Sequence, residues 1–396
     1  MATRLHPYHH FLFFFLNTTV KAQYTSLSES AEVSILTIGP GDQLYDKFGH
    51  SAFRVHNKSK NLDIVFNYGV YDFNTPNFYT KFARGKLLYQ LGVSYYQPFY
   101  DSYVAQNRWI KQQTLNLTYS EKQAIFNFLQ NNAKPENRKY KYDFFYDNCA
   151  TKIRDVLKEV LGDELQYNDD FVEEDYTFRE LIQKNLHWNT WGSLGIDVAL
   201  GAVIDKQATA WEYQFLPDYI FKAAETAVIT RNGSNEKLVS NTSTLFKNNP
   251  TKENSFFLTS PLFIFGILGL VIVFITFKDR KNNTRSRFLD ATIFFITGLI
   301  GVFLLLLWVA TDHTATANNY NLLWAFPLSL FFIGVIVKQF PKQWIHKYLF
   351  FLIVLLGLLT VHWISGVQVF ATALIPLLVA LAIRYIFLIG YLKQKI

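Results

Sequence analysis

Long apolar runs with few charged residues fill the C-terminal third of this 396-residue chain and constrain its fold more than any other feature. Five such runs follow Phe256: Phe257–Phe277, Phe288–Ala310, Leu322–Val337, Tyr348–Ile364 and Val367–Leu392. A helix of about 20 apolar residues crosses a hydrocarbon core of roughly 30 Å, and most of the five runs approach that length. We therefore predict an all-α domain of five transmembrane helices over residues 255–396.

Basic residues mark alternate loops of this region. They gather in Lys278–Arg287, in Lys338–Lys347 and in the tail at Lys393 and Lys395, whereas Thr311–Asn321 has neither Lys nor Arg. Basic loops stay in the cytoplasm, so the C-terminus is expected there and the domain before the helices is expected outside. These loops account for much of the net charge of +7, and no basic face with interleaved aromatics points to a nucleic-acid partner.

The N-terminus reads as a targeting segment. Arg4 precedes the short apolar run Phe11–Leu16, and the small residues of Val20-Lys21-Ala22 suit cleavage before Gln23. We predict a signal peptide over residues 1–22 and an exported domain over 23–230. The stretch 231–254 is rich in Asn, Ser, Thr and Lys, which is typical of a linker.

The exported domain mixes the two kinds of secondary structure. The pattern predicts strands over Ala31–Ile38, His50–His56 and Leu62–Val70, the last two joined by a short turn. Helical spacing covers Ser120–Asn132 with Ser120 as its cap, Phe178–Asn185, Asp197–Ala208 and Pro217–Val228. We therefore expect an α+β domain.

Cys149 is the only cysteine, and it stands where a nucleophile would be placed. Asp147 and Asn148 are cap-type residues, and the apolar spacing after them predicts a helix that starts at this point. The helix dipole favours the thiolate, and backbone N–H groups at the same end could hold an oxyanion. The alternative is a small buried hydrophobe, which describes most free cysteines.

A cysteine nucleophile needs a base and a third group that orients the base. Of His50, His56 and His187 we prefer His50 as the base, because apolar residues that read as core flank it. If the hairpin turn is centred between residues 58 and 59, paired numbers sum to 117 and His50 faces Asn67, whose amide could fix the imidazole tautomer. The alternatives for that third group are Tyr68, Asp46 and Tyr146.

Two further sets of residues are candidates outside this constellation. Asp312 and His313 end the second membrane helix on its outer side, where ionisable residues are candidates for substrate binding or for docking the exported domain. Asp197, Gly201 and Asp205 recur every fourth residue, so one helix face carries them, and that face either lines the site or is solvated. No cluster has metal-ligand spacing, and we expect neither metal nor cofactor.

Histidine on a strand, followed later by cysteine at a helix start, resembles the circularly permuted papain-like folds. These include the NlpC/P60-type hydrolases and the lecithin:retinol acyltransferase group. More closely, the chain resembles the Lnb family of bacterial lipoprotein N-acyltransferases in its periplasmic domain and its five-helix tail. The motifs that carry this likeness are Gly39-Pro40-Gly41-Asp42, Phe48-Gly49-His50, Asn67-Tyr68-Gly69, Asp147-Asn148-Cys149, Asp197-Val198-Ala199-Leu200-Gly201, Asp205, Phe215-Leu216-Pro217, Thr311-Asp312-His313 and Asn321-Leu322-Leu323-Trp324.

The resemblance implies a permuted papain-like catalytic domain on the periplasmic side of the bacterial inner membrane. Cys149, activated by His50, would take an acyl chain from a phospholipid as a thioester. The N-terminal amine of a diacylglyceryl-cysteine lipoprotein would then accept that chain. Asn148 and Tyr146, beside Cys149, are candidates for the oxyanion hole or its support.

Two alternatives from other classes remain open. An NlpC/P60-like peptidase or amidase acting on cell-wall peptides would use the same pair of residues, although it would need no five-helix domain. A non-catalytic membrane scaffold would leave Cys149 buried and inert.

Overall fold

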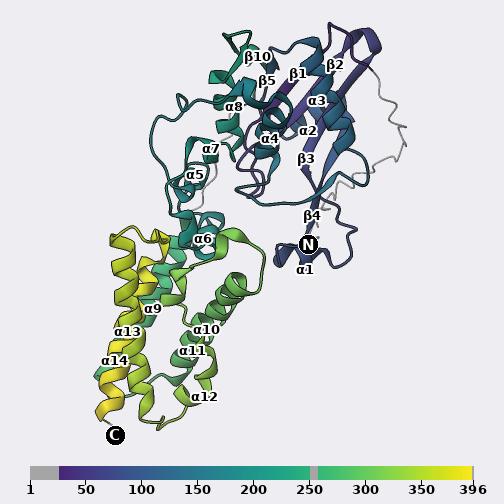
Figure 1. The fold of residues 1–396 in the computed structure, drawn as a ribbon. Helices are drawn as coiled ribbons and strands as arrows, with labels where there is room; N and C mark the ends of the chain where they lie inside the picture. The colour runs from purple at the N-terminus through teal and green to yellow at the C-terminus, as the bar shows by residue number, and fades with distance from the viewer. Residues whose placement is uncertain (1–25, 250–256, 395–396) are drawn as a thin grey trace.

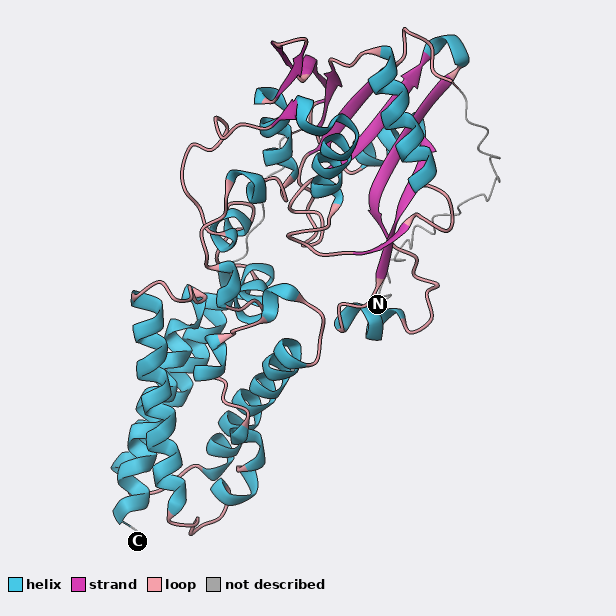
Figure 2. Ribbon diagram, in the orientation of Figure 1, coloured by secondary structure: helices cyan, strands magenta, loops and turns pink. Residues whose placement is uncertain are grey.

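The computed structural model describes residues 26–249 and 257–394, in which an α+β domain stands at one end of a helical bundle (Figure 1). The predicted signal peptide, residues 1–22, lies outside the described residues. The two parts differ in secondary structure, because all strands among the described residues lie in the N-terminal domain (Figure 2).

A seven-stranded antiparallel sheet forms the centre of the N-terminal domain, in the order β10-β5-β1-β2-β3-β4-β6. Its strands are β1 (Glu32–Ile38), β2 (His50–Asn57), β3 (Leu62–Val70), β4 (Leu88–Tyr95), β5 (Ile110–Leu115), β6 (Lys139–Lys141) and β10 (Val239–Phe246). Helices α3 (Tyr119–Asn132) and α4 (Cys149–Leu161) cover one face, where Ile35, Phe53 and Ile153 share a core. Helix α2 (Tyr96–Ala105) covers the other face, so the central strands are apolar on both sides.

The other elements of this domain surround the sheet. They are α1 (Phe78–Ala83), α5 (Phe178–Gln183), α6 (Trp191–Ala199), α7 (Ala210–Tyr213), α8 (Pro217–Thr226), and a small sheet of β7 (Leu165–Gln166), β8 (Val228–Arg231) and β9 (Ser234–Lys237). The fold class α+β is confirmed, and the three strands and the α4 helix predicted from the sequence are present.

Three local predictions were wrong. The cap of α3 is Thr118 rather than Ser120, because the Thr118 side chain and Glu121 form a reciprocal capping box. No single helix covers Asp197–Ala208, since α6 ends at Ala199 and a short 3-10 turn follows. The stretch 231–254 is not a linker throughout, because β10 within it pairs with β5 as the edge of the main sheet.

The bundle contains four long apolar helices, α9 (Pro261–Lys281), α10 (Arg287–Val309), α13 (Trp344–Ile364) and α14 (Ile375–Gln394). Each is long and apolar enough to cross a membrane. The predicted fifth helix over Leu322–Val337 is not one continuous helix, because that stretch forms a 3-10 turn and two four-residue helices, α11 (Leu328–Phe331) and α12 (Ile333–Ile336). Pro327 stands at the break, where it removes a backbone donor.

This broken segment still runs the length of the bundle beside α10 (Figure 1). At the end near the N-terminal domain, Asn321 donates to the carbonyl of Asp197 at 3.0 Å. At the far end, Arg285 donates to the carbonyls of Ile336 and Lys338, each at 2.7 Å. A Cβ on Gly301 of α10 would overlap the carbonyl oxygen of Ala325, so close helix contact shields the irregular backbone, which is the condition for such backbone at membrane depth.

A buried ionic cluster ties three helices together at the far end of the bundle. Arg384 of α14 is fully buried and donates to Asp290 of α10 and to Asp279 of α9, each at 2.8 Å. Both carboxylates are buried as well. Removing the arginine would leave two buried acids without their main cation, which is the costly way to break such a cluster.

Replacing Arg384 with leucine is therefore expected to destabilise the bundle by about 3–5 kcal/mol. The measurement is thermal unfolding of the full chain in detergent. The matched control is Arg280→Leu, because Arg280 is exposed at the same end of the bundle and should change the midpoint little. Equal midpoints for the two variants would contradict the account of the cluster.

Candidate active site

Asn148 fixes the start of the helix that carries Cys149. Its side-chain oxygen accepts from the N–H groups of Ala150 at 2.8 Å and Thr151 at 3.0 Å. Its amide nitrogen donates to the carbonyls of Phe144 at 2.7 Å and Phe215 at 2.8 Å. All of these bonds are inside the protein, so the side chain of Asn148 positions the helix start and does not face a substrate.

The capping leaves one N–H group of the first turn available. The N–H groups of Ala150 and Thr151 are taken by Asn148, and that of Lys152 donates to the Asn148 carbonyl at 3.0 Å. Within the described part of the chain, the N–H of Cys149 itself has no hydrogen-bond acceptor. It lies at the positive end of the helix dipole, next to the thiol.

His50 of β2 and Cys149 of α4 form an ionisable pair. Burial raises the pKa of the Cys149 thiol, but the charge of His50, its hydrogen bond and the N–H groups of Ser51 and Ala150 outweigh this and lower the pKa below its ordinary 9.0. Burial lowers the pKa of His50, but the thiolate and the bond to Asn67 raise it above its ordinary 6.5. The two directions favour a thiolate and an imidazolium together.

Asn67 lies within hydrogen-bond distance of the histidine, although the predicted register was wrong. The Nε2 of His50 and the Oδ1 of Asn67 are 2.6 Å apart. Phe53 pairs with Phe66 and Asn57 with Leu62, so paired numbers sum to 119 instead of 117. His50 and Asn67 are therefore diagonal neighbours on one face of the sheet, which is still within side-chain reach. With Nε2 donating to Asn67, Nδ1 is left for Cys149.

The irregular end of β3 opens the space above the thiol. Gly69 has a φ of +93° and follows Asn67 at a shift in the β3–β4 register. A Cβ at this position would lie 3.7 Å from the Cβ of Cys149, so any larger side chain would stand over the sulfur. Glycine therefore both permits the backbone conformation and keeps the approach to Cys149 clear.

The other predicted third groups are engaged elsewhere. Asp46 lies 3.8 Å from Arg108 in an ion pair, and the Tyr68 hydroxyl donates to Asn132 at 2.6 Å. Tyr146 is half-exposed, with its ring 6.0 Å from that of Phe178, and it lines a small pocket with residues of the bundle loop. The structure therefore places the Tyr146 ring against α5 and the loop after α10.

Two tyrosines near the thiol were missed in the sequence. Burial raises the pKa of Tyr140, and the thiolate raises it further, while its hydroxyl lies close to the Gly69 backbone. Burial raises the pKa of Tyr142 as well, and the charge of Cys149 raises it further. The Tyr142 ring stacks on that of Tyr89, with 4.2 Å between the ring centroids. The sequence offered one signal for them, since Tyr140 and Tyr142 are two residues apart and residues with this spacing share a face in an extended chain.

Asp312 and His313 lie at the junction between the two parts of the chain. The N–H of Asp312 donates to the Arg84 carbonyl at 2.9 Å, and its carboxylate pairs with Lys141 at 2.9 Å. The His313 ring donates to the Ala83 carbonyl at 3.2 Å. Of the two predicted roles, these contacts favour docking.

The acidic pair predicted on one helix face belongs to the same junction and is not solvated. Asp197 and Asp205 flank the buried Arg179, at 3.1 Å and 2.8 Å. Asp205 also accepts from the N–H of Val369, which precedes α14 in the bundle. The pair therefore holds a loop of the bundle against the N-terminal domain.

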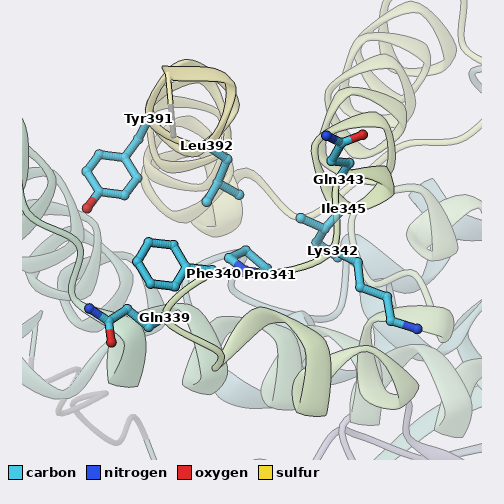
Figure 3. Close-up of a pocket in the computed structure, with 8 residues that line it drawn as sticks. All are labelled: Gln339, Phe340, Pro341, Lys342, Gln343, Ile345, Tyr391 and Leu392. Carbon is cyan, nitrogen blue, oxygen red and sulfur yellow. The ribbon is translucent and has the colours of Figure 1, made fainter. Parts of the chain in front are cut away.

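A pocket at the far end of the bundle lies away from the Cys149 pair. The pocket in Figure 3 is lined by Gln339, Phe340, Pro341, Lys342, Gln343, Ile345, Tyr391 and Leu392. It lies at the end of the bundle opposite to the N-terminal domain and contains no histidine or cysteine. Within residues 26–249 and 257–394, no group of three or more His, Cys, Asp or Glu side chains is placed to hold a metal ion.

Comparison with known families gives one match for each part. A model described as the Lnb N-terminal periplasmic domain matches residues 19–184, which include His50, Asn67 and Cys149. A model described as the Lnb transmembrane domain matches residues 251–395, which include the whole bundle. No curated protein and no solved structure matches the chain.

Proposed function

The chain belongs to the Lnb family, whose periplasmic and transmembrane domains together cover most of it, and from this premise we propose that it is a membrane-anchored cysteine acyltransferase. It moves an acyl chain from a phospholipid, through a thioester on Cys149, to the N-terminal amine of a diacylglyceryl-cysteine lipoprotein. The observation that carries the proposal is the Cys149–His50–Asn67 constellation at the end of a membrane bundle.

The first half-reaction uses the thiolate and imidazolium that the paired pKa shifts favour. The Cys149 thiolate attacks the ester carbonyl of the phospholipid and forms the S–C bond. The free N–H of Cys149, together with the Tyr140 hydroxyl, stabilises the oxyanion. When the C–O bond breaks, protonated His50 gives its proton to the departing alkoxide, and a lysophospholipid leaves.

The second half-reaction reverses the proton's path. The lipoprotein amine attacks the thioester carbonyl, and neutral His50 accepts the proton that the amine loses. The C–S bond breaks, the thiolate returns, and the product contains an amide. Asn67 holds the same ring nitrogen throughout, so that the other nitrogen faces the reacting atoms in both steps.

The membrane bundle suits substrates of this kind. Donor and acceptor both carry acyl chains, and removing such chains from a bilayer costs about 0.8 kcal/mol per CH₂ group. The junction contacts hold the catalytic domain against the bundle, so the domain works where the lipids are. The basic loop at Lys278–Arg287 supports an orientation with the far end of the bundle and the C-terminus in the cytoplasm and the catalytic domain in the periplasm.

The test is transfer to a defined acceptor. The purified full chain is incubated with a phospholipid of one acyl composition and a diacylglyceryl-cysteine lipopeptide, and the lipopeptide mass is measured. We expect a gain of one acyl chain on the free amine and none on a lipopeptide whose amine is acetylated. Release of cell-wall peptide fragments without lipid would favour the peptidase instead, and neither activity would favour the scaffold.

Asn67 offers a prediction specific to the orienting role. Asn67→Ala removes the acceptor for a charged imidazole and is expected to slow acylation about 10- to 100-fold, the equivalent of one hydrogen bond to a charged group. Asn67→Asp keeps an acceptor oxygen and should recover most of the rate. The readout is the rate of Cys149 alkylation across pH, in which the alanine variant should lose reactivity at low pH. An Asn67→Ala variant whose alkylation rate depends on pH as the wild type's does would remove Asn67 from the mechanism.

A further inference from the structure

The connection between β3 and β4, residues 71–87, carries an unusual exposed surface, which we call the aromatic foot. Exposed side chains on it include Phe73 at 66%, Tyr79 at 79% and Phe82 at 54%. The same segment contributes Arg84 and Lys86, both exposed. Contiguous exposed rings of this kind are rare on soluble domains and mark an interaction site.

The aromatic foot lies beside the outer end of a membrane helix (Figure 1). The carbonyls of Arg84 and Ala83 accept hydrogen bonds from Asp312 and His313, which lie just beyond the end of α10 at Val309. Val309, the last residue of α10, exposes 67% of its apolar side chain to the surroundings of the bundle. The lipid-facing surface of α10 therefore ends within a few residues of the foot.

Rings and basic groups together are the composition that suits the edge of a bilayer. Aromatic rings gather at the headgroup level, and long basic side chains extend toward phosphates. We propose that the aromatic foot inserts into the outer surface of the bilayer that holds the chain's own helices. Its occupant is phospholipid, because the surface is continuous with lipid-facing α10 and carries the cations that phosphate groups attract.

The rings also continue inward from the foot. The ring centroid of Tyr71 lies 5.8 Å from that of Phe78 in the foot and 5.4 Å from that of Tyr89. The Tyr89 ring in turn stacks on Tyr142, with 4.2 Å between the centroids. Burial raises the pKa of Tyr142, and the negative charge of the Cys149 thiolate raises that pKa further. Given the proposed function, this row of ring contacts leads from the aromatic foot toward the thiol, which is where the acyl chain of an interfacial lipid must arrive.

The test of insertion needs no catalysis, because Cys149 is the only cysteine. In a Cys149→Ala background, Phe82→Cys is labelled with an environment-sensitive fluorophore, and the full chain is placed in phosphatidylcholine nanodiscs that contain a nitroxide-labelled phospholipid. The control is Ala124→Cys, an exposed position on α3 in the part of the domain away from the bundle (Figure 1). Phe73→Cys gives a second position on the foot.

We expect the nitroxide lipid to remove about half or more of the fluorescence at both foot positions and little at Ala124→Cys, because interfacial segments bury their apolar face roughly 5–10 Å into the headgroup region. Quenching on the foot no stronger than at Ala124→Cys would overturn the proposal. Since the labelled protein lacks the nucleophile, this outcome is independent of whether Cys149 forms an acyl-enzyme.

Discussion

Replacing Cys149 with alanine is expected to lower acyl transfer by about four orders of magnitude or more, because the chain contains no second thiol that could form the thioester. The measurement is the turnover of phospholipid and lipopeptide by purified protein. Asn148 caps the same helix through its own side chain, so the variant should fold as the wild type does.

A matched control separates chemistry from folding. Thr151, in the same turn, is buried and accepts from the Asn148 N–H at 2.8 Å. Thr151→Ser keeps that bond and should retain activity, whereas Cys149→Ala should have the same melting temperature as the wild type but no turnover. Full turnover by Cys149→Ala would exclude the thioester route and leave the scaffold as the better description.

Replacing His50 with alanine is the second change with a large expected effect, about 10²–10⁴-fold in rate. His50 lowers the pKa of the Cys149 thiol below 9.0 against the opposing effect of burial. Without His50, burial predominates, so less thiolate exists at any pH near neutral. The rate of alkylation by iodoacetamide, which follows the thiolate, should therefore fall off at a higher pH than in the wild type.

The sign of this shift distinguishes a catalytic pair from a structural one. In the wild type, reactivity should persist as the pH falls below 9.0 and should decline only below the lowered thiol pKa. Transfer should also decline as the pH rises through the raised pKa of His50, because the leaving alkoxide then lacks its acid. His56→Ala, on the same strand, is the control. It should change neither the decline of alkylation at low pH nor the decline of transfer at high pH. An unchanged alkylation profile in His50→Ala would contradict the pair.

Much of the site could be predicted because its signals are local. The cap residue Asn148 precedes an amphipathic run, which fixed the start of α4 and the position of the thiol. His50 was identified by its apolar flanks, since a polar side chain in a buried strand needs a partner. Asn67 was reached with the wrong register. The 3-10 turn at Lys58–Lys60 and Asn61 in the left-handed region move the turn centre by one residue.

The parts that failed depend on contacts distant in sequence. Hydropathy alone cannot show that the stretch after Asn321 is broken into short helices. That break is tolerated because α10 approaches closely at Gly301, and this contact is distant in sequence. β10 reads as a polar linker because it is an edge strand with exposed side chains. The burial of Asp197 and Asp205 could not be seen in the sequence, since their partner Arg179 precedes them by 18 and 26 residues.

The most direct test of the central claim is the intact mass of the purified protein after incubation with phospholipid of one defined acyl chain. The acceptor is omitted so that the thioester accumulates. We predict a mass increase of one acyl group that hydroxylamine removes and that Cys149→Ala lacks. A protein that gains no acyl mass, although iodoacetamide alkylates its Cys149 readily, would contradict acyl transfer and favour a hydrolase.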